Sequence, residues 1–278
     1  MHISVSVLVE NTALKKGLLA EHGLSVYIEA GEQKILFDTG QSGIVLHNAK
    51  VLGHRLDRLD AVVLSHGHYD HTGGLKHVLK SCGDLKIYAH PSAFKPKFAC
   101  NENGVGRSIG LPGADGGLLP NIEKLSVSTT QPTEIIEGIF VTGQIPRVTP
   151  FEDTGGPFFL DAACTQPDLM FDDQALFFNT SQGTVVLLGC AHAGVINTLV
   201  YVHELTGGKS IHAVMGGMHL LSADEERMNR TMDHFYRLDP DLLGPAHCTG
   251  RSAVFRLHAS FGRKCIPFSG GTRITFTR

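Results

Sequence analysis

The feature that most constrains this chain is the decapeptide SHGHYDHTGG, which directly follows the apolar run AVVL at 61–64. Within six positions it places three imidazoles and one carboxylate: His66, His68, Asp70 and His71. Imidazole nitrogen and carboxylate oxygen are the donors that zinc and other first-row divalent metals take from proteins. A turn at the end of a buried strand can aim several donors at one point, and the two glycines permit a tight turn. The segment therefore predicts a metal site; a solvated polar loop is the alternative.

The composition excludes several classes of protein. With 278 residues, of which 42% are hydrophobic and 18% charged, the chain can bury a sizeable core. Its 24 basic and 27 acidic residues give a formal charge of −3, so we expect no nucleic-acid partner and no anionic membrane surface. Any binding of phosphate must then be local. The 16 histidines favour a metal site but do not indicate which of them form it.

The cysteines favour a reduced protein, because they form no CxxC pair and no compact framework. They are Cys82, Cys100, Cys164, Cys190, Cys248 and Cys265. The N-terminal sequence MHISVSVLVE reads as a strand and not as a signal segment, so we predict a cytoplasmic location. No apolar run reaches the ~18 residues that a membrane helix requires.

The pattern of apolar residues predicts a mixed α/β (α+β) chain. We expect strands at 3–10, 24–30, 34–38, 61–65, 85–90, 122–129, 135–142, 174–180, 184–189, 210–215, 242–246 and 273–277. We expect helices at 42–52, 75–81, 195–205, 223–237 and 251–260. Because no linker separates the halves, the pattern predicts one domain over 1–278, with two sheets packed face to face and helices outside. The Gly- and Pro-rich stretch 91–120 is either a lid over a site or a tolerated surface insertion.

Later strands share one design, in which an apolar run ends in a small residue and then presents a histidine. His192 in VVLLGCAH and His247 in DLLGPAHC are predicted metal ligands, because a strand end can hold a ligand rigidly. His219 in HAVMGGMH is either a ligand or a residue that contacts substrate or supports a ligand. Cys190 could bind metal, but a buried cysteine after a strand is more often a small core residue.

Other polar residues are candidates for supporting roles. Asp38, in FDTG at a strand end, is predicted to accept a hydrogen bond from the free ring nitrogen of a ligand, with helix capping as the alternative. Arg147 and Glu152 lie in a segment too polar for a core and could contact substrate; a surface salt bridge is the alternative. Lys95 and Lys97 could meet a phosphate, or simply form a solvated face.

The histidine segment, with FDTG upstream and HCTG downstream, resembles the HxHxDH signature of the metallo-β-lactamase superfamily. Further runs resemble the subgroup of 7,8-dihydropterin-6-methyl-4-(β-D-ribofuranosyl)aminobenzene-5'-phosphate synthases: TGQIPRVTPFE, DDQAL, GCAHAGVIN, GGMHL and PAHCTG. The resemblance covers nearly the whole chain. It implies a four-layer αββα sandwich with a two-metal site at its edge.

The resemblance also implies how the ligands divide. His66 and His68 would bind one divalent ion, and the other would be held by Asp70, His71 and His247. Hydrolases of the superfamily usually carry a histidine in a GHTPG-like turn and a bridging aspartate after a strand. This chain has Gln144 and the run Gly189-Cys190-Ala191-His192 instead, so His192 would be the replacement ligand and Cys190 would support it. Zinc is the expected metal, with manganese and iron as alternatives.

Together these features predict a metal-dependent enzyme with a dinuclear site. It would act on a phosphorylated or pterin-like small molecule, either by displacing a diphosphate or by hydrolysis. Asp70 would orient the attacking water in a hydrolysis, and His219 is the second catalytic candidate. The alternatives are an iron-binding redox or sensing module and a metal-binding scaffold without turnover. The oligomeric state stays open.

Overall fold

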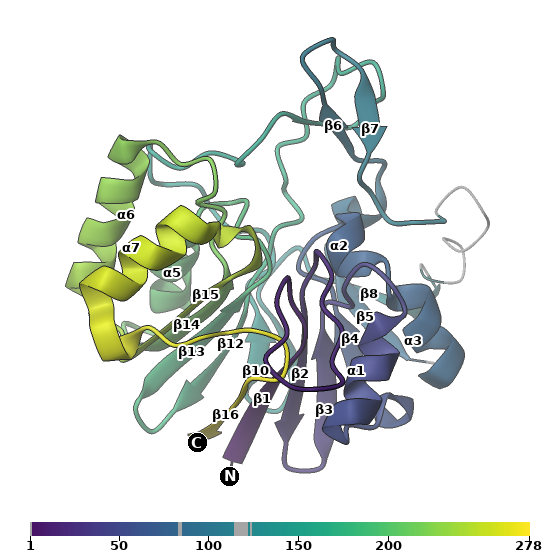
Figure 1. The fold of residues 1–278 in the computed structure, drawn as a ribbon, viewed down its shortest axis with the longest axis vertical. Coiled ribbons are helices and arrows are strands. Elements are labelled where there is room, and N and C mark those ends of the chain that lie inside the picture. Colours follow the sequence, from purple (N-terminus) through teal and green to yellow (C-terminus); the bar gives the residue numbers. More distant parts are fainter. Residues whose placement is uncertain (1, 83–84, 114–121, 123) are drawn as a thin grey trace.

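The computed structural model describes residues 2–82, 85–113, 122 and 124–278. Two large sheets face each other, and helices cover the outer side of each (Figure 1). This arrangement confirms the predicted αββα sandwich. The first and last strands pair within one sheet, so the two ends of the described chain lie side by side.

The first sheet has seven strands. In spatial order they are β16 (Arg273–Thr277), β1 (His2–Val9), β2 (Ser25–Ala30), β3 (Gln33–Phe37), β4 (Ala61–Val63), β5 (Lys86–Ala89) and β8 (Ser126–Ser128). The second sheet has six strands. Their order is β15 (Leu242–Ala246), β14 (Ile211–Gly217), β13 (Gly183–Leu188), β12 (Leu176–Thr180), β10 (Ile139–Val141) and β9 (Thr133–Ile136).

The helices follow the sheets to which they are connected. Those beside the first sheet are α1 (Ile44–Leu52), α2 (Tyr69–Thr72) and α3 (Leu75–Cys82), with the 3₁₀ turns η1 (Leu56–Arg58) and η2 (Pro91–Phe94). Those beside the second sheet are α5 (Val195–Leu205), α6 (Glu225–Leu238) and α7 (Arg251–Phe261), with η4 (His247–Thr249) and η5 (Gly262–Lys264). One buried apolar cluster lies between the sheets, and one lies under each helical layer. No helix among the described residues is long and apolar enough to cross a bilayer.

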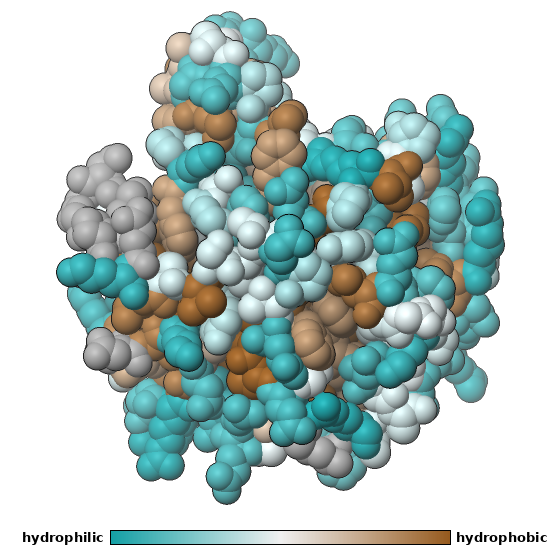
Figure 2. Space-filling view, turned by 180° about the vertical axis from the view of Figure 1, so that it is seen from behind, coloured by the Kyte–Doolittle hydropathy of each residue, from teal (hydrophilic) through white to brown (hydrophobic). Residues whose placement is uncertain are grey.

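A small third sheet projects from the sandwich (Figure 1), and the space-filling view shows a lobe that stands out from the molecule (Figure 2). It comprises β11 (Phe158–Phe159), β6 (Phe98–Cys100) and β7 (Gly106–Ser108). The predicted loop at 91–120 is therefore partly ordered into η2 and a hairpin, and its residues 114–120 lie outside the described residues. Strands of only three residues give no readable alternation, which is why the hairpin was not predicted. Its action as a lid stays a prediction.

Two sequence predictions were wrong in detail. The single strand expected at 135–142 is a hairpin of β9 and β10, because Gly138 adopts a φ of 74° and reverses the chain. The six cysteines are not all free, because Cys100 and Cys164 form a disulfide between β6 and a segment 64 residues later. Spacing alone could not reveal a pair so far apart in sequence.

The strand directions bring the chemistry-bearing loops to one edge. In the first sheet β3, β4 and β5 are parallel, and in the second sheet β13, β14 and β15 are parallel. The carboxyl ends of parallel strands meet at the same edge of a sheet, where loops can combine their side chains. The histidine segment follows β4, and the later histidines follow β13, β14 and β15.

Candidate metal centre

Three buried histidines, here called the first ligand group, converge from both sheets: His66, His68 and His192. The potential ligand atoms of the group all lie within 4.8 Å of one another. Nε2 of His66 lies 3.0 Å from Nδ1 of His68. The loop between these two histidines requires glycine, because a Cβ on Gly67 would lie 2.1 Å from the carbonyl oxygen of Ala93.

A second ligand group consists of Asp70, His71 and His247. Nε2 of His247 lies 3.2 Å from Oδ2 of Asp70 and 3.2 Å from Nε2 of His71. Nε2 of His71 is 3.8 Å from the same carboxylate oxygen. Donor atoms this close, on side chains that are almost fully buried, are spaced as ligands around a small cation.

Four of the five histidines in the two groups turn the same nitrogen toward the centre. Their Nδ1 atoms lie within hydrogen-bond distance of a group outside it: His66 at 2.9 Å from Ser65 Oγ, His71 at 2.7 Å from Asp38 Oδ2, His192 at 2.7 Å from the Thr154 carbonyl, and His247 at 2.9 Å from Asn11 Oδ1. Such partners fix the ring and leave Nε2 for a metal. Nε2 of His192 has no hydrogen-bond partner among the described residues, although it is buried. A divalent ion fits this donor set.

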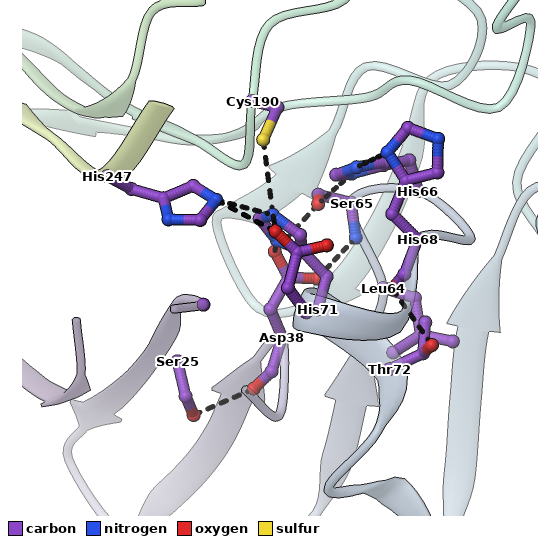
Figure 3. Close-up of polar contacts among 12 residues, drawn as sticks. Ser25, Asp38, Leu64, Ser65, His66, His68, His71, Thr72, Cys190 and His247 are labelled. Atoms are coloured by element: carbon purple, nitrogen blue, oxygen red, sulfur yellow. Dashed lines mark hydrogen bonds and ion pairs between the residues drawn. The ribbon is translucent and has the colours of Figure 1, made fainter. Parts of the chain in front are cut away.

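Asp38 organises the histidine segment (Figure 3). Its Oδ1 accepts a hydrogen bond from the backbone N–H of Ser65 at 2.7 Å, and its Oδ2 accepts one from the Ser65 hydroxyl at 2.7 Å. The same Oδ2 lies 2.7 Å from Nδ1 of His71. Asp38 itself has a left-handed φ of 58°, so the chain bends sharply after β3 to present the carboxylate.

The protonation of the histidines favours cation binding in the first ligand group. Burial lowers the pKa of His66 and of His192 well below its usual range, and it lowers the pKa of His68 to about 3. These rings are neutral at pH 7, as metal ligands must be. Burial also opposes the protonation of His71, but the carboxylates of Asp38 and Asp70 outweigh it and raise the pKa of His71 to about 9.

Cys190 lies beside both groups, and His219 lies beside the first. Sγ of Cys190 is 3.2 Å from Nε2 of His71. The ring centroid of His219 is 4.3 Å from that of His192, and its Nε2 lies 3.2 Å from the carbonyl oxygen of Gly155. His219 has a φ of 46°, a left-handed backbone that turns its ring back toward the site.

The ligand groups form part of the wall of a pocket of about 770 Å³. Apolar and aromatic side chains line it together with two arginines: Phe158, Ile109, Leu221, Val254, Phe255, Arg107 and Arg251. Arg107 comes from β7 and Arg251 from the start of α7. Neither arginine forms an ion pair with a described carboxylate, although the Arg107 guanidinium lies 5.9 Å from the centre of the Tyr69 ring.

The two predicted substrate-binding residues lie outside the pocket lining. The Arg147 guanidinium donates hydrogen bonds to the carbonyl oxygens of Leu169, at 2.6 Å, and His192, at 3.3 Å. Glu152 accepts hydrogen bonds from the N–H groups of Ile196 and Asn197 in the first turn of α5. Their contact with substrate stays a prediction, while these bonds hold the segment that carries His192.

Lys97 is fully buried, so the expectation of a solvated face is wrong at that position. Its Nζ lies 2.7 Å from Oδ2 of Asp168 and 2.9 Å from Oδ1 of Asp172. The local sequence KPKF does not indicate that Lys97 would be buried, because the two aspartates that pair with it are distant in sequence. Lys95 is exposed, as a solvated residue would be.

Several residues at the site are not among those predicted from the sequence. Nε2 of His22 lies 3.2 Å from Oδ2 of Asp70, and the His22 ring packs 4.8 Å from that of His247. Its hydrogen bond to Asp70 raises the pKa of His22 above its usual value. Asn11 could have been predicted, because it lies just after the end of β1, and the predicted ligands also lie just after strands. His22 and Arg107 lie in short segments that carry no such signal.

Known proteins are similar in sequence to this chain over most of its length. The sequence model of the Metallo-beta-lactamase superfamily matches residues 19–146. The chain is 35% identical, over 91% of its length and 93% of the relative, to an uncharacterized protein of Methanocaldococcus jannaschii. It is 33% identical to the 7,8-dihydropterin-6-methyl-4-(beta-D-ribofuranosyl)-aminobenzene-5'-phosphate synthase of the same organism, over 84% of this chain and 83% of that one.

Solved structures agree with these matches. The crystal structure of a metal-dependent hydrolase of the beta-lactamase superfamily is 28% identical in sequence and superposes with a TM-score of 0.83, covering 99% of this chain and 100% of the other. Zn(2+)-bound PqqB from Methylobacterium extorquens shares the fold, with a TM-score of 0.59 at 13% identity and 99% coverage of both chains.

Proposed function

Because the chain belongs to the metallo-β-lactamase superfamily, we propose that it is a metal-dependent enzyme with a dinuclear centre. Its substrate is a phosphorylated or pterin-like small molecule, and the reaction is displacement of a diphosphate or hydrolysis. The similarity to the dihydropterin-linked phosphate synthase, over 84% of this chain, supports this choice of substrate class.

The observation that carries the proposal is the pair of adjoining ligand groups in one pocket wall. Each group offers three ligand atoms, and the spare ring nitrogen of His66, His71, His192 and His247 is held by a group outside the centre. Divalent ions held there would supply Lewis acidity, which activates water or neutralises charge on a leaving phosphate. Zinc is the expected metal, because imidazole dominates the donor set.

Protein side chains would perform the remaining tasks. Asp70 faces the pocket with its carboxylate beside His247 and His22, so it can bind a metal and orient a reacting oxygen. His219 packs against His192 of the first ligand group and also belongs to the pocket lining. It can exchange a proton with a leaving or attacking group.

The rest of the pocket supports a substrate that is flat at one end and anionic at the other. The Phe158 ring lies 5.0 Å from His68 and 5.2 Å from His192, next to the ligand groups. Arg107 and Arg251 bring two cations that no described carboxylate neutralises. One guanidinium group can bind two phosphate oxygens at once. Because the chain has a net negative charge and no general attraction for anions, a phosphate would depend on such local cations.

The test uses the full chain loaded with zinc or manganese and a dihydropterin that carries a diphosphate on its 6-methyl group. We expect metal-dependent release of diphosphate. If an added arylamine, an aminobenzene ribofuranoside 5'-phosphate, is required and incorporated, the reaction is transfer; release without it is hydrolysis. The His68→Ala variant should stay soluble but lose turnover, while Arg58→Ala, at an exposed position outside the pocket lining, should keep it. Metal-loaded protein that turns over neither this compound nor simpler phosphate esters would contradict the proposal.

A further inference from the structure

We infer that the Cys190 thiolate is a ligand shared by both metal ions, so that sulfur bridges the two ligand groups. The inference rests on the proposed dinuclear centre and adds to it a donor that joins its halves. It changes the role expected for Cys190 from a supporting residue to a ligand.

The position of the sulfur carries the inference. Sγ of Cys190 lies within 4.8 Å of a ring nitrogen of His66 and of His71, one from each ligand group. It also lies within that distance of ligand atoms of His192 and His247. Among the described residues, no other side chain belongs to three of the clusters that could hold a metal.

The separations suit coordination to a common ion. Zinc binds sulfur at about 2.3 Å and imidazole nitrogen at about 2.0 Å, so two such ligands on a tetrahedral ion lie about 3.5 Å apart. Sγ of Cys190 is 3.2 Å from Nε2 of His71, and Figure 3 shows it directed toward that ring. Thiolate sulfur has lone pairs for two ions, and the thiol proton passes to solvent as the metals bind.

Apolar packing does not explain why the Cys190 side chain is buried. Cys265 is also a buried free cysteine, and it belongs to the apolar cluster under the second helical layer. Cys190 is only 3% exposed but belongs to none of the three apolar clusters. Imidazole nitrogens surround its sulfur instead. Ala191 has a left-handed φ of 56°, so the chain turns there and directs Cys190 and His192 to the same place.

A bridging thiolate predicts the metals that the centre prefers. Sulfur is a soft donor, which favours zinc, cobalt or ferrous iron over magnesium. Replacing Cys190 with aspartate would keep a side chain able to bridge two ions but offer hard oxygen donors. The two variants Cys190→Ser and Cys190→Asp therefore separate the loss of sulfur from the loss of the bridge.

The experiment loads the full-length wild type and variants with Co²⁺ alone and records the near-ultraviolet band of cobalt–thiolate charge transfer. X-ray absorption of the Zn²⁺ form measures the sulfur shell at about 2.3 Å. We expect two ions and a sulfur signal in the wild type, one tightly bound ion and no signal in Cys190→Ser, and two ions without the signal in Cys190→Asp. Cys265→Ala, a buried cysteine outside the pocket, should match the wild type in both respects.

The outcomes separate the two proposals. A wild type that binds two ions without sulfur coordination would overturn the bridge and leave the proposed function standing. A signal lost in Cys248→Ser but kept in Cys190→Ser would show that the ligand is the neighbouring cysteine, whose Sγ also lies within 4.8 Å of that of Cys190. A wild type that binds no metal would overturn both proposals. Circular dichroism of each variant shows that the fold is retained before metal content is compared.

Discussion

At the scale of single residues, Asp38 decides how well the second ligand group is held. Its carboxylate fixes Nδ1 of His71 and also accepts two hydrogen bonds from Ser65. One side chain thus sets the ring orientation of a predicted ligand and the path of the histidine segment. Because it follows β3 and not β4, it also fastens the segment to a neighbouring strand.

We predict that Asp38→Asn weakens metal binding about 10- to 100-fold, as loss of an orienting carboxylate does in other metal sites. The amide keeps the shape of the side chain but not the charge that favours the required His71 tautomer. Competition with a chromophoric chelator measures the affinity. Asp57→Asn removes a carboxylate that is paired with the exposed Arg55, so it should not change the affinity. Equal affinity in Asp38→Asn and the wild type would show that the carboxylate is not an orienting group.

The residues whose place at the centre could be predicted from the sequence are those that a single local segment positions. The histidine segment is contiguous, and His192 and His247 follow strands that can be read from their apolar runs. Arg107 and Arg251 reach the same pocket from a hairpin and from a helix start, and their meeting depends on the packing of both. Nothing at either position in the sequence indicates the other.

At the scale of elements, a buried ion cluster joins the projecting hairpin to the histidine segment. Lys97, just before β6, contacts Asp168 and Asp172 through its ammonium group. Oδ2 of Asp172 accepts a hydrogen bond from the N–H of Gly67 at 2.8 Å. The lysine and the ligand-bearing turn are therefore connected through one carboxylate.

Main-chain hydrogen bonds connect the same two parts of the chain. The N–H of Tyr69 donates to the carbonyl oxygen of Ile109, directly after β7, at 2.8 Å. The N–H of Ile109 donates in turn to the carbonyl oxygen of Lys97, also at 2.8 Å. The hairpin thus reaches the histidine segment through main-chain as well as side-chain contacts, and removing the lysine charge tests how much the side-chain part contributes.

We predict that Lys97→Met lowers the free energy of unfolding at pH 7 by about 3 to 5 kcal/mol, because it leaves two buried carboxylates without their cation. Urea denaturation measures the change. Lys95→Met replaces an exposed lysine two residues away and should alter the same quantity by less than about 0.5 kcal/mol. A loss in Lys97→Met no larger than in this control would mean that the ion cluster does not stabilise the fold.

The pH dependence of that loss follows from Asp172. Burial opposes ionisation of this carboxyl, but the Lys97 ammonium outweighs it and holds the pKa of Asp172 below its usual value. In the wild type this carboxylate contributes stability that is present above about pH 4 and is lost as the pH falls through the lower folded-state pKa. Without Lys97, we expect burial to raise the pKa of Asp172 instead. The variant then loses stability as the pH rises above about 4, because the buried carboxyl opposes ionisation. The difference between the two proteins should therefore shrink from pH 7 to pH 4, and a constant difference would contradict this account.

Most elements could be predicted because their patterns are local. The helix at 195–205 and the strands at 242–246 and 273–277 have the predicted bounds. The short strands β6, β7 and β11 could not be predicted, because each is stabilised by pairing with a neighbouring strand and not by its own sequence. The same holds for the disulfide between Cys100 and Cys164, which joins segments that only the folded hairpin brings together.

At the scale of the whole molecule, the centre lies at the edge of the sandwich where loops from both sheets come together. His66, His68, Asp70 and His71 follow β4 of the first sheet, whereas His192 and His247 follow β13 and β15 of the second. The sandwich could be expected from the resemblance to a known superfamily, but the alternation of strands and helices does not fix which loops face each other. That meeting depends on the strand order of both large sheets.

Because both sheets supply predicted ligands, bound metal should act as a cross-link that stabilises the whole fold. A ligand present at 100 times its dissociation constant adds about 2.7 kcal/mol to the free energy of unfolding. For a chain of this size that corresponds to an increase in Tm of roughly 5 to 10 °C. We predict such an increase when Zn²⁺ is added to chelator-treated protein, measured by calorimetry, and a smaller one in His68→Ala, which keeps only the second ligand group intact.

The control for this cross-link is His203→Ala, at an exposed position in α5, which should respond to Zn²⁺ like the wild type. It removes an imidazole that could bind zinc at the surface without joining the two sheets. An equal increase in Tm in His68→Ala and the wild type would mean that an ion held by His68 does not contribute to the stabilisation. The absence of an increase in the wild type would mean that the two sheets are not joined through this centre.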